Sequence, residues 1–217
     1  MAKMTASLLQ SYDYYLKVPT AQSLLKLKNT LTQEFTGSVA TVRGERYEDY
    51  VDKKLLLNQN FDRDFEQTAF ECLRGSTQQD WLKPLDIVTK YGTFTYKGRL
   101  DFLQPDCIYD LKTTKHFKAD DYHIKWQHSI YALAMNKKRF VYIIAVFNDE
   151  QGLVPTSIET VEPTIATLDD LTKHTEACVK FMLDNFDEEF RKWSRMPVSE
   201  AINQNNEAIG QNNEVIF

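Results

Sequence analysis

Hydrophobic residues along the chain alternate between a helical and a strand-like spacing. Apolar positions that recur every three or four residues predict helices over about 4–16, 20–34, 40–58, 61–74, 118–136 and 165–195. Alternating or continuous apolar runs predict strands over about 83–89, 92–97, 99–104, 107–113, 139–148 and 153–161. Helices before and after a short meander, followed by helix and strand, predict an α/β domain with a central mixed sheet flanked by helices.

The C-terminal segment differs from the rest in composition. Past Pro197 the chain is polar, and NQNNEAI (203–209) is nearly repeated as GQNNEVI (210–216). We therefore expect one domain over 1–197 and a flexible polar tail over 198–217. The tail ends in Val-Ile-Phe, an apolar tip that would suit docking on a clamp or an annealing protein. A disordered end without a role is the favoured interpretation, because termini are usually poorly ordered, and docking is the alternative.

Composition excludes several classes of protein. The 217 residues hold no apolar run of transmembrane length and no signal pattern, which favours a cytoplasmic protein with no membrane partner. The three cysteines are far apart, so neither a disulfide framework nor a zinc or iron–sulfur site is expected. The net charge of −5 does not by itself indicate a nucleic-acid binder. Lysines nevertheless gather at Lys112, Lys115, Lys118 and Lys125.

Charges occur inside a segment that otherwise resembles a buried hairpin, GRLDFLQPDCIYDLKTTK (98–115). If Pro105 and Asp106 form its tip, Asp101 lies opposite Asp110, and Lys112 points to the same face as Asp110. Like charges directly opposite each other destabilise a sheet, and buried carboxylates need partners. A divalent cation between the two carboxylates would remove that conflict.

Four motifs in the same order resemble those of the PD-(D/E)XK nucleases, in the branch of RecB-like and lambda-exonuclease-like proteins. They are GERYE (44–48), GRLD (98–101), IYDLK (108–112) and QHSIY (127–131), preceded by the similar opening helix TASLLQSYDYY (5–15). The resemblance covers most of residues 5–150 and implies a restriction-endonuclease-like core. The chain departs from the pattern at Leu100, where a literal Pro-Asp motif has proline. Branches with an iron–sulfur cluster need four cysteines, and this chain has three.

The resemblance also implies roles for individual residues. Metal ligands would be Asp101, Asp110, the Leu111 carbonyl and Glu48, holding Mg²⁺ or Mn²⁺. Lys112 would orient the attacking water and stabilise negative charge. The implied DNA-positioning residues are Gln127 and Tyr131, and a groove beside the site would use Lys115, Lys118 and Lys125.

Each assignment has an alternative. Asp101 and Asp110 would also fit surface positions beside a turn, and Gln127 and Tyr131 are ambiguous because tyrosines at helical spacing often belong to the core. Lys112 would serve equally as a simple ion-pair partner of Asp110, and Glu45 and Asp49 compete with Glu48 on the same predicted helix. The histidines form no HxxxH or HExxH pair and are expected to be structural or peripheral.

The sequence thus predicts a Mg²⁺-dependent DNA exonuclease that acts on linear duplex ends, in phage or bacterial recombination or repair. An endonuclease of restriction or repair type is the first alternative. A catalytically silent relative that only binds nucleic acid or a partner is the second. A glycosidase-like carboxylate pair is a more remote alternative, which would leave Lys112 unexplained.

Overall fold

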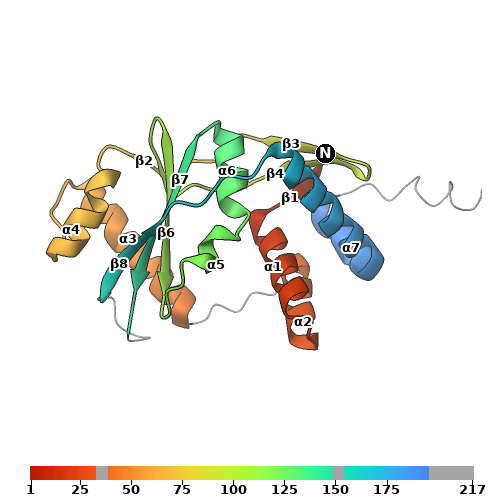
Figure 1. The fold of residues 1–217 in the computed structure, drawn as a ribbon, viewed down its shortest axis with the longest axis horizontal. Helices are drawn as coiled ribbons and strands as arrows, with labels where there is room; N and C mark the ends of the chain where they lie inside the picture. Colours follow the sequence, from red (N-terminus) through yellow and green to blue (C-terminus); the bar gives the residue numbers. More distant parts are fainter. Residues whose placement is uncertain (33–38, 149–153, 196–217) are drawn as a thin grey trace, which may run out of the picture.

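The computed structural model describes residues 1–32, 39–148 and 154–195, which form two sheets with helices around them (Figure 1). The larger sheet has the strand order β2-β5-β6-β7-β8 and contains one parallel pair, β6 with β7. Its strands are β2 (Thr77–Gln78), β5 (Phe102–Leu103), β6 (Cys107–Thr114), β7 (Arg139–Val146) and β8 (Ser157–Val161). The smaller sheet has the order β1-β4-β3, from β1 (Ala2–Met4), β4 (Gly92–Tyr96) and β3 (Leu85–Thr89).

Helices cover both faces of the larger sheet. On one side lie α3 (Val39–Leu56) and α4 (Asp64–Phe70), followed by a 3₁₀ turn over Glu71–Leu73. On the other side lie α1 (Ala6–Lys17), α2 (Ala21–Thr32), α5 (Asp120–His123), α6 (Gln127–Met135) and α7 (Leu168–Ser194). Within the described parts of the chain, no helix is both long and apolar enough to cross a membrane.

The two faces of β6 and β7 pack into two separate cores. Ile108, Phe140, Tyr142 and Ile144 belong to the core shared with α1, α6 and α7. Residues of the opposite parity belong to a second core with α3 and the segment that follows it, and these are Cys107, Leu111, Val141, Ile143 and Ala145. Burial on both faces explains the continuous apolar run of β7, as the sequence predicted.

The predicted fold class is confirmed, since a mixed sheet is flanked by helices. Thr5 caps α1 by accepting the Leu8 N–H at 3.3 Å, which fixes where the first helix begins. The predicted tail over 198–217 lies outside the described residues.

Some predicted elements were wrong in extent. The helix expected over 118–136 is two helices, and between them Trp126 stacks on His174 of α7 with ring centroids 4.6 Å apart. The helix expected from residue 61 begins at Asp64, and the Phe61 N–H before it bonds the Gln67 side chain at 2.9 Å. Strands β1 and β2 were missed, since two or three residues are too few to show a period.

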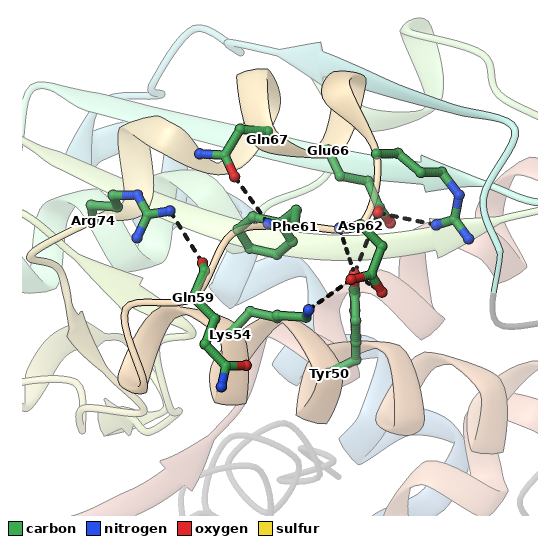
Figure 2. A network of polar contacts seen from close by, with 9 residues as sticks. Tyr50, Lys54, Gln59, Phe61, Asp62, Glu66, Gln67 and Arg74 are labelled. Atoms are coloured by element: carbon green, nitrogen blue, oxygen red, sulfur yellow. Dashed lines mark hydrogen bonds and ion pairs between the residues drawn. The ribbon is translucent and has the colours of Figure 1, made fainter.

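A buried carboxylate fixes α4 against α3. Glu66 is 0% exposed and accepts hydrogen bonds from the Tyr47 hydroxyl at 2.8 Å and the Arg63 guanidinium at 3.0 Å. The Tyr50 hydroxyl lies between Glu66 and Asp62, and Lys54 pairs with Asp62 at 2.7 Å (Figure 2). Buried charges persist only when they are paired and hydrogen-bonded, so this network fixes the rotation of α3.

We expect Glu66→Gln to lower the free energy of unfolding by about 1–3 kcal/mol, because Arg63 and two tyrosine hydroxyls lose an ionised acceptor. Glu71→Gln is the matched control, since Glu71 pairs with Arg74 at the surface, where an ion pair contributes about 0–1 kcal/mol. Urea denaturation of both variants measures the difference. Equal effects would contradict a dominant role for the buried network.

Candidate active site

The hairpin of β5 and β6 has the register that the turn predicted. Phe102 pairs with Tyr109 and Leu103 with Ile108, and the Gln104 N–H closes the turn on the Cys107 carbonyl at 2.9 Å. One step further along the same register, Asp101 lies opposite Asp110. Asp101 Oδ2 accepts the Leu111 N–H at 2.8 Å, which holds the first carboxylate against the strand that carries the second.

Asp101 lies where the chain leaves the larger sheet. The segment around residues 77–82 runs antiparallel to 98–103, with the Gln79 N–H bonded to the Asp101 carbonyl at 2.9 Å. Gln79 has a φ of 54°, in the left-handed region, and this kink interrupts the regular ladder. The predicted strand over 99–104 is therefore reduced to β5, and Asp101 stands at the break.

Asp110 and Lys112 share one face of β6. Asp110 is 1% exposed, and its Oδ1 accepts a hydrogen bond from Gln127 Nε2 at 2.7 Å. The Lys112 ammonium forms an ion pair with Oδ2, which has no hydrogen bond beyond that contact within the described chain. The ion pair with Asp110, which was the alternative explanation of Lys112, is thus present. The Lys112 side chain is nevertheless 30% exposed.

The carboxylates disturb each other electrostatically. Burial and the charge of Asp110 raise the pKa of Asp101 to about 8, with a further contribution from Glu48, while Lys112 acts in the opposite direction. Burial alone would lower the pKa of Lys112, but the charges of Asp110 and Asp101 raise it above its ordinary value. Lys112 therefore stays an ammonium, and one cation faces several acidic groups.

Helix α3 brings Glu48 to the same place from the other face of the sheet. Glu48 is partly buried, whereas Glu45 and Asp49 are exposed. Its Oε1 accepts a hydrogen bond from Gln79 Nε2 at 2.6 Å, and its charge contributes to the raised pKa of Asp101. Of the three acidic residues that competed for this position, the structure brings Glu48 toward the aspartates.

Helix α6 contributes the two residues of its predicted motif. Gln127 bonds Asp110 directly, and Tyr131, one turn later, is only 8% exposed. Burial and the charge of Asp110 raise the pKa of Tyr131 to about 12. A side chain on Gly98 would place its Cβ 2.9 Å from the Tyr131 hydroxyl, which explains the glycine of the GRLD segment. Gln127 thus holds Asp110 from within the protein, whereas Tyr131 belongs to the core that α6 shares with β6 and β7.

The three lysines predicted to line a groove are not equivalent. Burial and the nearby charge of Lys112 lower the pKa of Lys125, whose ammonium lies 4.3 Å from the centroid of the Tyr122 ring. Lys125 also lines a hollow of about 530 Å³ together with Thr113 and Thr114, the residues that follow Lys112. Lys115 and Lys118 are exposed on the segment after β6.

The residues fit a divalent cation chemically. Oxygen donors are the ligands of Mg²⁺, which is commonly bound by one or two carboxylates and retains several waters. Asp110 Oδ2 is buried without a regular hydrogen bond, and the repulsion at Asp101 would be relieved by positive charge. No three acidic, histidine or cysteine side chains converge on one point in the ranges that the structure describes. Water or backbone oxygen would have to complete the coordination.

Two residues near the carboxylates were missed by the sequence analysis. Gln79 donates to Glu48 and, at 3.1 Å, to Asp52 Oδ2. Burial raises the pKa of Asp52, against the opposing effect of the Gln79 hydrogen bond. Asp52 follows Glu48 by four residues, so helical spacing already places the two on one face. Nothing in the sequence marks Gln79, because its role depends on the backbone kink.

Comparison with known proteins gives a structural likeness alone. No family model matches the chain, and no curated protein matches its sequence. The crystal structure of SSO0001 aligns with 88% of this chain and 85% of its own at 12% identity and a TM-score of 0.54. LHK-Exo from Laribacter hongkongensis, in complex with dAMP, covers 90% of this chain and 95% of its own, at 12% identity and a TM-score of 0.49.

A phage-related exonuclease from Haemophilus somnus aligns with 85% of this chain and 82% of its own, at 13% identity and a TM-score of 0.45. The likeness to SSO0001 shows a shared fold. The two exonucleases are too distant to indicate a shared reaction. The function therefore has to be argued from the residues of the site.

The repulsion at Asp101 can be tested without any assumption about activity. The pKa of Asp101 is about 8 in the folded protein, against about 3.9 for an exposed aspartate. Between about pH 4 and about pH 8 the folded state therefore binds one more proton than the unfolded state. The free energy of unfolding of the wild type therefore falls as pH rises from about 4 to about 8. With divalent cations removed by EDTA, Asp101→Asn should melt above the wild type at pH 9.

This difference in melting temperature should shrink toward pH 5, where the Asp101 carboxyl is protonated in the folded protein. Asp106→Asn, at the exposed tip of the hairpin, is the control and should show no such pH dependence. A lower melting temperature for Asp101→Asn at pH 9 would contradict the predicted repulsion.

Proposed function

We propose that the chain is a Mg²⁺-dependent DNA nuclease of the PD-(D/E)XK type that hydrolyses phosphodiester bonds, and that it acts as an exonuclease on linear duplex ends. The observation that carries the proposal is the hairpin itself, where Asp101 and Asp110 lie in opposite positions and Lys112 shares a face with Asp110. A buried acidic pair with one adjacent lysine is costly for stability, and it suits a reaction on a phosphate.

The cation would be held by Asp101 and Asp110, with Glu48 acting through water, and with the Leu111 carbonyl and water as further donors. Bound there, Mg²⁺ or Mn²⁺ supplies Lewis-acid polarisation of the phosphate and a lowered pKa for water. Gln127 keeps Asp110 oriented by donating to Oδ1, so that Oδ2 remains directed toward Lys112. A fixed carboxylate loses no orientation when the substrate arrives.

Lys112 would act on the reacting groups. Its ammonium is held in the charged form by the two aspartates, and the side chain as a whole is 30% exposed. From that position it can donate a hydrogen bond to a phosphate oxygen or to the attacking water, and it stabilises the negative charge that develops in the transition state. The neutral form of lysine could supply neither effect to the same extent.

The substrate path would pass Lys125. This residue combines proximity to Lys112 with a place in the hollow beside β6, and phosphate contacts by lysine ordinarily dominate DNA affinity. Exposed Lys115 and Lys118 would add to the attraction further out. A short groove at this place would favour a frayed end, where one strand enters without melting internal base pairs. Digestion of this kind would supply single strands to an annealing protein in phage or bacterial recombination, with the tail as a docking segment.

The decisive experiment compares wild type and Asp110→Asn on end-labelled linear duplex and on covalently closed circles. The wild type should degrade linear DNA progressively in Mg²⁺ or Mn²⁺ and spare closed circles, because the proposed groove admits a free strand. Asp110→Asn should be inactive, since the amide keeps the shape but loses the charge. Gel electrophoresis of the products measures both effects.

Circular dichroism should show an unchanged fold in the variant, and Asp106→Asn should cleave like the wild type. Discrete fragments from closed circles, produced as fast as linear DNA is digested, would favour the endonuclease. Full activity in EDTA would refute a metal-dependent mechanism, and binding of DNA without cleavage in either metal would favour a silent relative.

Lys112→Ala separates the lysine from the aspartates. We expect a loss of roughly 10²–10³ in kcat, the usual effect of removing one stabilising donor. Calorimetric binding of Mn²⁺ should be retained, because lysine is not a ligand. Turnover near that of the wild type would show that Lys112 serves only as the ion-pair partner of Asp110.

A further inference from the structure

Gln79 occupies a backbone conformation that its own side chain does not favour. Its φ of 54° is left-handed, a region that costs a residue other than glycine about 1–2 kcal/mol. Among the described residues, the other three cases besides glycine are Asn58, Asn136 and Arg195, and each lies at or just beyond the end of a helix. Gln79 follows a strand, so a helix end does not explain its conformation.

The kink joins two elements that carry acidic residues of the site. The Gln79 N–H donates to the Asp101 carbonyl at 2.9 Å, which ties its backbone to the break in the hairpin. Its side-chain amide donates to Glu48 Oε1 at 2.6 Å and to Asp52 Oδ2 at 3.1 Å, both on α3. One residue therefore links the helix to the strand at the level of the aspartates.

The chemistry of this link requires an amide. Glu48 and Asp52 are both acidic and lie one helical turn apart, where like charges repel. An NH₂ group has two donor hydrogens and can satisfy both carboxylates at once. Without this amide, repulsion from Asp52 and Asp101 would turn the Glu48 carboxylate away, because its side chain has several rotatable bonds. The left-handed backbone is what brings the amide into reach while the N–H remains bonded to Asp101.

We propose that Gln79 is a positioning residue, which holds Glu48 toward the Asp101–Asp110 pair and aligns Asp101 with it. The inference rests on the proposed function, because it assigns Gln79 to the same site. Residues that orient metal ligands typically affect cation affinity or activity by roughly 10–100-fold when they are replaced.

Gln79→Gly separates positioning from structure. Glycine adopts a positive φ without strain and keeps the N–H, so the melting temperature should be equal to or above that of the wild type. We expect kcat for linear DNA to fall roughly 10–100-fold with little change in KM, and calorimetric binding of Mn²⁺ to weaken. Gln79→Met is the second variant, which keeps the length of the side chain and removes its donors.

A double-mutant cycle tests whether Gln79 acts through Glu48. In the background of Glu48→Ala, Gln79→Gly should cause no further loss of activity, whereas independent effects would add. Wild-type kcat and Mn²⁺ affinity in both Gln79 variants would overturn the proposal while leaving the nuclease intact. If the wild type does not cleave DNA, the proposed function fails, and Mn²⁺ affinity still decides whether Gln79 positions the acidic groups. Equal affinity, or no binding in the wild type, overturns the positioning role.

Discussion

The structure around the site depends on the opposition of two carboxylates across one hairpin. Asp101 and Asp110 occupy facing positions, and burial together with the charge of Asp110 raises the pKa of Asp101. Three polar contacts of the described residues partly offset the repulsion between these two carboxylates. The Leu111 N–H bonds Asp101, the Gln127 amide bonds Asp110, and the Lys112 ammonium pairs with Asp110 from the same face. A hairpin selected only for stability would have apolar or oppositely charged residues in these positions.

The rest of the fold supplies these contacts from both faces of the sheet. Helix α6 brings Gln127 from one core, and α3 brings Glu48 from the other. The orientation of α3 depends in turn on the buried Glu66, which bonds Tyr47, the residue directly before Glu48. A polar network that is remote from the hairpin in sequence thus helps to determine where a carboxylate of the site lies. Stability and function are coupled through one helix.

The sequence predicted those parts of the site that depend on local pattern. The alternation of residues and the Pro105-Asp106 turn were enough to place Asp101 opposite Asp110. The spacing of α6 was enough to place Gln127 and Tyr131 on one face. The break before α6 could not be predicted, because it comes from the packing of Trp126 on His174 across the core. The proposed role of Gln79 could not be predicted for a related reason, since it depends on a left-handed kink and on partners 22 to 31 residues away.

Charge balance gives the strongest reason to expect a cation at this site. Lys112 is one positive charge beside Asp101, Asp110 and Glu48, whose charges act on one another. Asp52, next to Glu48, has the opposite charge of Arg99 nearby. Lys125 lies nearby, and burial together with the charge of Lys112 lowers its pKa. Without a further positive charge the folded protein must keep protons on some of these groups, as the pKa of about 8 at Asp101 indicates. A divalent cation would allow all of them to ionise together. The same charge would attract a phosphate that the acidic groups alone would repel, so the charge imbalance that destabilises the fold is also what the proposed reaction on a phosphate would require.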